Sequence, residues 1–285
     1  MKNFTNLLEE CTLCPRNCKV NRLKNELGFC KVGRNPKISA YNLHFGEEPP
    51  ISGTSGSGTI FFTGCNLSCV FCQNYPISQL HHGKEITVEK LAEIMIELQN
   101  QNAHNINLVT PTHVVPQIIE AITIARTKGL KIPIVYNSGG YEKVETLKQL
   151  KGYIDIYMPD AKYSDDKNAE KYSNAKDYWK INKPALKEMH RQVGNLQIKN
   201  GVAVKGLMIR HLVLPGNISG SRTVFEFVAE QISEKTYMSV MAQYHPANKT
   251  DEFPELQRKL TEDEYLRVLN IADDLGLTNG WRQML

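Results

Sequence analysis

The chain has 285 residues, a formal net charge of +4, and 41% hydrophobic and 22% charged residues. This length allows one large α/β domain, the composition excludes a disordered chain, and the small net charge gives no reason to expect a nucleic-acid partner. No apolar run reaches the roughly 20 residues that span a bilayer, and MKNFTNLLEE is no signal peptide, so we expect a cytoplasmic protein with no membrane partner.

Residues 1–52 form a Cys-, Lys- and Asn-rich segment, which we expect to be separate from the main domain, residues 53–285. All cysteines lie within the first 72 residues, in two groups: Cys11, Cys14, Cys18 and Cys30, then Cys65, Cys69 and Cys72. In a reducing compartment such tight thiol clusters are more often metal ligands than disulfides. The stretch EEPPISGTSGSG (47–58) has too much Gly, Ser and Pro for a helix or strand, and we expect it to be a linker.

The first cysteine group offers four soft ligands at C-x2-C-x3-C-x11-C spacing: Cys11, Cys14, Cys18 and Cys30. Four thiolates suit a closed tetrahedral zinc site or an iron–sulfur cluster, so the spacing favours a structural metal without deciding between the two. Zinc would hold residues 1–52 in shape, whereas a second cluster would relay electrons or bind substrate. A set of free thiols is the remaining alternative.

From residue 59 onward, short apolar runs alternate with longer amphipathic runs of helical spacing. The expected strands are 59–64, 106–110, 132–137, 153–160, 206–214 and 237–244. The expected helices are 88–101, 114–128, 142–151, 222–233 and 262–275, with further helices in the polar region after 160. About six alternations predict a parallel sheet with right-handed crossovers, either doubly wound or curled into a partial barrel.

Polar residues interrupt the apolar pattern where the expected strands end. In either arrangement, the carboxyl ends of parallel strands meet at one edge of the sheet, where reactive groups belong. These residues are Cys65, Thr110, His113, Asn137, Ser138, Asp160, Lys162 and His245. We therefore expect them to surround one site.

GCNLSCVFCQN places Cys65, Cys69 and Cys72 at C-x3-C-x2-C directly after the first of these strands. Three thiolates on one short loop can hold an iron–sulfur cubane and leave one iron open, which a substrate with an amine and a carboxylate can chelate. The alternatives are a structural zinc site that lacks its fourth ligand, or buried free thiols.

This loop, with Phe71 just before the third cysteine, resembles the signature of the radical S-adenosylmethionine (SAM) superfamily. The resemblance implies a 4Fe-4S cluster at Cys65, Cys69 and Cys72, whose open iron binds SAM. An electron then cleaves SAM, and a 5'-deoxyadenosyl radical abstracts hydrogen from a substrate. It also implies a partial (β/α)6 TIM-like barrel, here with a small Cys-rich amino-terminal extension, and an electron donor such as flavodoxin or ferredoxin.

Most of residues 53–285 resembles the activating enzymes of glycyl-radical enzymes, in particular proteins like pyruvate formate-lyase activating enzyme. Gln73 and Asn74 stand where activases often have His-Asn, MPDAK (158–162) resembles Met-Leu-Asp-Leu-Lys, and IRHLVLPG (209–216) resembles Ile-Arg-Tyr-Val-Val-Val-Pro-Gly. AQYHPA places His245 where activases have a Tyr-His pair. The resemblance implies abstraction of hydrogen from a glycine of a partner enzyme. The alternatives are radical SAM modification of another protein, a peptide or a small molecule, or a metal-stabilised binding protein without catalysis.

Two stretches depart from the family pattern. Radical SAM proteins commonly have Gly-Gly-Glu after the second strand to hold the SAM amine, whereas this chain has Val109 to His113 there. Thr110, Thr112 and His113 offer acceptors for that amine instead. The second departure is NSGG (137–140), where activases tend to have Thr-Asn-Gly; Asn137 and Ser138 either approach SAM closely or only form a tight turn.

Three charged residues and one histidine have both functional and structural interpretations. Asp160 and Lys162, two apart on a strand, share a face and either contact SAM or substrate or form a structural ion pair. Arg210 interrupts an apolar strand and either binds the SAM carboxylate or pairs with a buried acid. His245 either acts in the site or is a satisfied histidine at a strand end.

Overall fold

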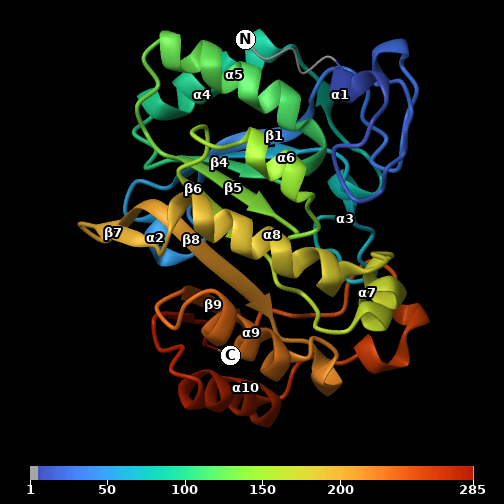
Figure 1. Cartoon of the computed structure of the whole chain (residues 1–285), viewed down its shortest axis with the longest axis vertical. Coiled ribbons are helices and arrows are strands. Elements are labelled where there is room, and N and C mark those ends of the chain that lie inside the picture. Colours follow the sequence, from blue (N-terminus) through green and yellow to red (C-terminus); the bar gives the residue numbers. More distant parts are fainter. Residues whose placement is uncertain (1–5, 285) are drawn as a thin grey trace.

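The computed structural model describes residues 6–284 (Figure 1). The strands are β1 (Lys37–His44), β2 (Ser57–Phe62), β3 (Lys84–Glu85), β4 (Ile106–Val109), β5 (Ile134–Ser138), β6 (Ile156–Pro159), β7 (Gln197–Lys199), β8 (Val202–Leu212), β9 (Tyr237–Met241) and β10 (Gly280–Arg282). The helices are α1 (Asn6–Glu9), α2 (Pro49–Ser52), α3 (Tyr75–Ser78), α4 (Val88–Asn100), α5 (Val115–Thr127), α6 (Val144–Gln149), α7 (Asp166–Ser173), α8 (Tyr178–Val193), α9 (Ser221–Gln231) and α10 (Glu262–Asp274).

One sheet orders these strands β10-β9-β8-β6-β5-β4-β2-β1-β3, and β7 pairs with β8 outside this row. From β2 to β10 every neighbouring pair along the row is parallel, whereas β1 is antiparallel to both β2 and β3. The two ends of the row, β3 and β10, do not pair with each other, so the sheet is open. The predicted α/β fold with a mostly parallel sheet is confirmed, in the form of an open, partial barrel.

The crossover helices follow the sheet from α4 and α5 past α6 and α8 to α9 and α10 (Figure 1). α4 shows why these segments are helical. Its N-cap Thr87 accepts a hydrogen bond from Lys90 N, and its buried residues are Leu91, Ala92, Ile94, Met95 and Leu98. Because this spacing places one apolar stripe on one side of a helix, α4 packs into the main core together with α5 and the sheet.

Side chains of the parallel strands alternate between the two faces of the sheet. Tyr136 of β5 belongs to the core beneath the helices, whereas its neighbour Val135 belongs to a separate apolar cluster with Ile156, Met158 and Met208 on the other face. The cavity described below opens on this second face, at the carboxyl ends of the strands.

The amino-terminal part differs from the sequence-based expectation. β1 was not predicted, because its residues KISAYNLH have little apolar alternation, yet it pairs with β2 along its length. Residues 47–58 were expected to be a linker, but they contain α2 and the start of β2. Glu48, Ile51 and Ser52 are buried there, and α2 packs against β8.

None of the helices between residues 6 and 284 combines the length and the hydropathy that a bilayer-spanning segment needs.

Candidate active site

The loop with Cys65, Cys69 and Cys72 leaves the carboxyl end of β2 and lines a cavity of about 500 Å³ with all three cysteines. Gly64 begins the loop with a φ of +82°, and a Cβ there would lie 2.4 Å from the carbonyl oxygen of Cys30. Only glycine tolerates both the left-handed backbone and this close approach. The loop is therefore pressed directly against the amino-terminal segment.

Backbone contacts hold the loop from two sides. On one side Ser68 N donates to Ser173 O at 3.0 Å and Val70 N donates to Tyr172 O at 2.9 Å, both at the end of α7. On the other side Arg16 Nε donates to Asn66 O at 2.8 Å. Three ligands can be presented to one cluster only if the loop keeps its shape, and these contacts fix it.

Each of the three thiols has at least one hydrogen-bonding neighbour. Leu67 N donates to Cys65 Sγ at 3.3 Å, Ser173 Oγ donates to Cys69 Sγ at 3.0 Å, and Cys72 Sγ lies 3.3 Å from Ser78 Oγ. Burial raises the pKa of the Cys65 and Cys69 thiols, and the positive charge of Lys162 opposes this rise at both. Without a metal these thiols are neutral, so iron coordination is what would keep them ionised.

Five of the residues predicted at strand ends line the same cavity as the cysteines: Thr110, Asn137, Ser138, Asp160 and Lys162. Arg210, within β8, lines it too. Asn74, after the third cysteine, also lines it. Thr110 has a φ of +60°, which is unusual for a β-branched residue. Its amide donates to Asn137 O at 2.8 Å, so this strained conformation joins the ends of β4 and β5.

α8 positions the turn after β5 and the end of β6. Tyr178 Oη lies 2.8 Å from Gly139 O and 3.0 Å from Asp160 O, and Asn182 Nδ2 donates to Gly140 O at 2.8 Å. A Cβ on Gly140, whose φ is +73°, would lie 2.1 Å from Asp160 O. The NSGG turn thus needs glycine at residue 140 so that the two strand ends can approach each other.

Asp160, Lys162 and Arg210 form a mostly buried ion-pair network in the cavity wall. Asp160 accepts hydrogen bonds from Arg210 Nε at 2.9 Å and from Lys162 Nζ at 2.5 Å. Burial alone would raise the pKa of the Asp160 carboxyl, but Arg210 and Lys162 outweigh it and hold this pKa below its usual value. All three groups are therefore charged, which allows them to recognise polar parts of a ligand.

Four predicted residues lie outside the cavity wall. Phe71 is buried and packs edge-on against Tyr244, with ring centroids 5.9 Å apart. His245 lies near the cavity rim. Its Nδ1 is 3.2 Å from Nε2 of Gln73, and Gln73 lines the cavity. Phe71 also shares an apolar cluster with Leu67 and Cys69, which line the cavity, so it supports the cluster loop from behind.

Thr112 and His113 also point elsewhere. Thr112 Oγ1 donates to Glu142 Oε1 at 2.5 Å, and His113 Nε2 lies 2.8 Å from Thr63 O. Burial lowers the pKa of His113 to about 3 and raises that of Glu142 to about 7. Thr112 and His113 thus join the strand ends to groups behind the cavity, and their predicted contact with SAM stays a prediction.

Two acidic residues that were not predicted from the sequence, Glu47 and Glu48, also line the cavity. Glu47 Oε2 lies 3.7 Å from Arg210 Nη1, and burial raises the pKa of the Glu47 carboxyl to about 7 despite this arginine. Their place in an expected linker concealed them, although two adjacent acids before Pro49 and Pro50 in an otherwise uncharged stretch were a usable signal.

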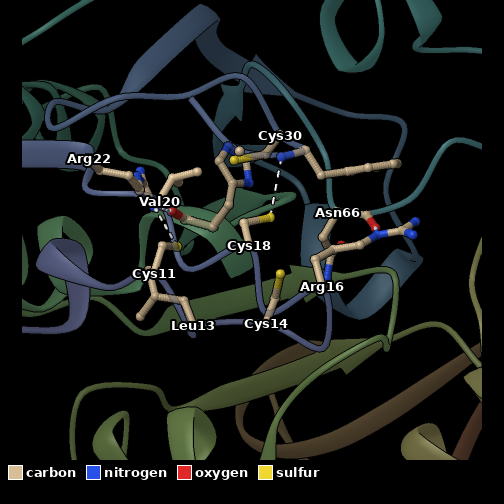
Figure 2. Close-up of a pocket in the computed structure, with 12 residues that line it drawn as sticks. Cys11, Leu13, Cys14, Arg16, Cys18, Val20, Arg22, Cys30 and Asn66 are labelled. Atoms are coloured by element: carbon tan, nitrogen blue, oxygen red, sulfur yellow. Dashed lines mark hydrogen bonds between the residues drawn. The ribbon is translucent and has the colours of Figure 1, made fainter. Parts of the chain in front are cut away.

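Cys11, Cys14, Cys18 and Cys30 line a second, much smaller pocket of about 10 Å³ behind the cluster loop (Figure 2). Arg22 Nη1 donates to Cys11 Sγ at 3.9 Å, and Phe29 N donates to Cys18 Sγ at 3.4 Å. His113 lines this pocket too, and its buried Nδ1 has no partner within residues 6–284. The structure thus brings all four cysteines together, with one further unused nitrogen beside them.

Neither cysteine group closes around one point. Within the described part of the chain, no three His, Cys, Asp or Glu side chains are arranged so that they could hold a single metal ion. Thiolates on one zinc ion stand only about 3.8 Å apart, given Zn–S bonds of about 2.3 Å, whereas a cubane spreads its ligands further. The position of Cys65, Cys69 and Cys72 beside a large cavity fits a cluster with SAM next to it.

Comparison with known proteins identifies the family to which this chain belongs. The sequence model described as the Radical SAM superfamily matches residues 59–216, which include the cluster loop and the ion-pair network. The chain belongs to the radical SAM superfamily. Membership implies an enzyme that uses a 4Fe-4S cluster and SAM, and the cavity lined by Cys65, Cys69 and Cys72 is where this radical SAM protein would hold them.

Two similar proteins come from Methanocaldococcus jannaschii. Uncharacterized protein MJ0674 is 33% identical over 282 residues, which are 95% of this chain and 77% of that protein. Uncharacterized protein MJ0808 is 26% identical over 293 residues, which cover 93% of this chain and 81% of that protein. Both alignments cover more than nine-tenths of this chain.

Among solved structures, Streptococcus suis SuiB bound to S-adenosylmethionine is similar in fold. It superposes with a TM-score of 0.54 at 14% identity, over 78% of this chain and 48% of SuiB. The chain therefore spans about half the length of this neighbour, and the likeness concerns the fold alone.

Proposed function

We propose that the protein reductively cleaves SAM and uses the resulting radical to abstract hydrogen from a glycine of a partner enzyme. The observation that carries this proposal is that three loop thiols and the network of Asp160, Lys162 and Arg210 line one cavity. The thiols match the cluster signature, and the network matches the activase-like residues MPDAK and IRHLVLPG. These are the features that the activase resemblance links to SAM and substrate.

The proposed reaction needs one external electron. A reduced flavodoxin or ferredoxin supplies it, the C5'–S bond of SAM breaks, and methionine and a 5'-deoxyadenosyl radical result. This radical takes a hydrogen atom from the glycine Cα, which leaves 5'-deoxyadenosine and a glycyl radical. The 4Fe-4S cluster supplies the electron transfer and the iron to which SAM binds.

The residues of the chain have binding and orienting roles in this proposal. Cys65, Cys69 and Cys72 hold the cluster, and Thr110, Asn137 and Ser138 present hydroxyl, amide and backbone groups to SAM. Arg210 and Lys162 are positive groups suited to a carboxylate, and Asp160 keeps both in place. Phe71, Thr112, His113 and His245 support these residues from behind or from the rim.

The open sheet supports a macromolecular substrate, because a closed barrel would leave no side entrance for a loop. One structural neighbour, SuiB bound to precursor peptide SuiA, favours a second candidate, radical modification of a peptide. A small-molecule substrate is a third outcome of the test below.

The test is electron paramagnetic resonance of candidate glycyl-radical enzymes after anaerobic incubation with the reconstituted protein, SAM and reductant. We expect a doublet that becomes a singlet when the glycine is deuterated at Cα. If no partner gives this signal while deuterium from a labelled peptide or metabolite enters 5'-deoxyadenosine, the activase proposal is wrong. If SAM is not cleaved at all, the remaining interpretation is a metal-stabilised binding protein without catalysis.

We also propose that residues 1–52 bind a metal through their four cysteines and precede a radical SAM domain of residues 53–285, to whose sheet and cavity β1, Glu47 and Glu48 contribute. Four cysteines around one pocket, with the free Nδ1 of His113 beside them, support a thiolate-bound centre, either zinc or an iron–sulfur cluster. Metal analysis of a variant without Cys65, Cys69 and Cys72 separates the two, and finding neither metal would rule the centre out. Such thiols and low-potential electron donors point to a cytoplasmic setting.

A further inference from the structure

Cys69 is the most deeply buried of the three loop cysteines, whereas Cys65 and Cys72 are half-buried. Its backbone carbonyl accepts hydrogen bonds from Gln79 Nε2 at 2.9 Å and from Asn248 Nδ2 at 3.2 Å. These contacts fix the place of Cys69, so its thiol keeps a defined set of neighbours.

The Cys69 thiol ends a row of three buried groups. Tyr163 Oη lies 2.7 Å from Ser173 Oγ, and Ser173 Oγ lies 3.0 Å from Cys69 Sγ. Tyr163 and Ser173 are both 0% exposed. Ser173 O also accepts a hydrogen bond from Ser68 N at 3.0 Å. Backbone and side chain of Ser173 are therefore both bound to the cluster loop.

Metal coordination would fix the direction of both hydrogen bonds. A metal-bound thiolate has no proton and can only accept, so Ser173 must donate its single hydroxyl proton to Cys69. Ser173 Oγ is then an acceptor in its other contact, and Tyr163 must donate to it. Burial raises the pKa of Tyr163 well above its ordinary value, so the phenol keeps its proton. Two donors in series thus point toward one cluster ligand.

The other two thiols have weaker donors. Cys65 accepts from the backbone amide of Leu67 at 3.3 Å, and Cys72 lies 3.3 Å from the hydroxyl of Ser78, a half-buried residue that lines the cavity. A hydroxyl at a cavity wall can exchange its partner for water. Hydrogen bonds are stronger in a water-free environment and polarise one another in a row, so the donor to Cys69 is favoured on both counts.

The hydroxyl of Tyr163 is not needed for packing. Its ring lies edge-on to Tyr178, with centroids 5.7 Å apart, in the apolar cluster that includes Leu67 and Cys69. A phenylalanine would fill the same space. Within residues 6–284, the hydrogen-bond partner of the Tyr163 hydroxyl is Ser173 Oγ. This hydroxyl therefore serves Ser173, and through it Cys69.

We propose that Tyr163 and Ser173 form a hydrogen-bond relay that raises the reduction potential of the 4Fe-4S cluster through Cys69. Reduction adds negative charge to the cluster and its thiolates, and a donated hydrogen bond stabilises this charge. A higher potential favours electron transfer from flavodoxin or ferredoxin. The inference rests on the part of the proposed function in which the loop cysteines hold the cluster. Tyr163 and Ser173 are positioning residues, and neither lines the cavity.

The experiment is an anaerobic redox titration of the reconstituted full chain, followed by electron paramagnetic resonance of the reduced cluster. The signal that changes on addition of SAM identifies the loop cluster, separately from any cluster at the amino-terminal cysteines. At the wild-type midpoint potential, the ratio of reduced to oxidised cluster should fall about tenfold in Ser173→Ala, which is a shift of about 59 mV for a one-electron couple. Tyr163→Phe should lower the ratio by a smaller factor, because Ser173 still donates.

Tyr157→Phe is the matched control for Tyr163→Phe. Tyr157 is equally buried, but its hydroxyl contacts Gln192 Oε1 at 2.9 Å, so this variant should keep the wild-type ratio. A wild-type ratio in Ser173→Ala would overturn the inference, and so would an equal fall in Tyr157→Phe and Tyr163→Phe. If Ser173→Ala does not fold or does not hold the cluster, Tyr163→Phe decides, and a wild-type ratio in that variant rules out the relay.

Formation of 5'-deoxyadenosine, measured on the same samples, separates this inference from the proposed function. SAM cleavage together with unchanged potentials in the variants removes only the relay. Shifted potentials without SAM cleavage support the relay and remove the proposed function.

Discussion

The two cysteine groups meet at Gly64 and Cys30 but occupy different environments. Cys65, Cys69 and Cys72 face a cavity of about 500 Å³, whereas Cys11, Cys14, Cys18 and Cys30 line a pocket of about 10 Å³. Three ligands beside open space leave a position for a reactant, whereas four thiolates can fill all the positions of a structural metal. The same residue type thus suits catalysis in one place and structural support in the other.

The largest expected effect is on the loop group. Cys69→Ala should abolish formation of 5'-deoxyadenosine from SAM and dithionite, because the thiolate is the ligand and no neighbouring residue can replace it. Chromatography of the quenched reaction measures the loss. Cys14→Ala is the comparison from the other group: if folded, it should retain some cleavage. Full activity of Cys69→Ala would remove the distinction between the groups.

The amino-terminal group should act on stability. Cys14→Ala should lower the free energy of unfolding by several kcal/mol, because ligand loss removes metal-binding energy that is also folding energy. Thermal unfolding with parallel metal analysis measures this, and chelator treatment of the wild type should cause a similar loss. Unchanged stability together with unchanged metal content would show that the four thiols are not a metal centre.

Removal of the Asp160 carboxylate from the ion-pair network should strongly lower the free energy of unfolding. Asp160→Asn leaves Arg210 and Lys162 buried without their carboxylate, and we expect a loss of about 3–5 kcal/mol in urea unfolding. Asp273→Asn breaks the exposed pair with Arg282 and should cost about 1 kcal/mol or less. Equal effects of the two variants would mean that the cavity network is as weakly coupled as a surface pair.

Glu142, behind the cavity, should make stability depend on pH. Burial raises the pKa of its carboxyl from 4.5 to about 7, so between these values the folded state binds more protons than the unfolded state. Stability should therefore fall as pH rises from about 4.5 to about 7, by roughly 3 kcal/mol in total from this group. Urea unfolding across this range measures the slope, and Glu142→Gln should flatten it. If Glu142→Gln shows the same slope as the wild type, other titrating groups cause the pH dependence of stability.

Local pattern made much of the parallel sheet predictable. The helix expected at 88–101 is α4 (Val88–Asn100), and the strand expected at 237–244 begins with β9 (Tyr237–Met241). The cluster loop was predictable from its spacing. Asp160 and Lys162 do form the expected pair, but β6 ends at Pro159, before both residues. These features depend on neighbours in sequence.

Features that depend on distant partners were not predictable. β1 is stabilised by pairing with β2, and Glu48 is held at the cavity by Ser239, 191 residues away. Thr112 and His113 were placed beside Thr110 by sequence, but the 3₁₀ turn at Thr112–Val114 directs them toward Glu142 and Thr63. Single-sequence patterns contain no information on such long-range contacts.

The central claim is that Cys65, Cys69 and Cys72 hold a 4Fe-4S cluster whose open iron binds SAM. Electron-nuclear double resonance of the reduced protein, with SAM carrying ¹⁵N in its amino group, tests it most directly. The account predicts a ¹⁵N coupling to the reduced cluster that is retained in a variant lacking Cys11, Cys14, Cys18 and Cys30, provided that the variant folds. A reduced cluster that shows no ¹⁵N coupling in the wild type, or a coupling that survives loss of Cys65, Cys69 and Cys72, would contradict it.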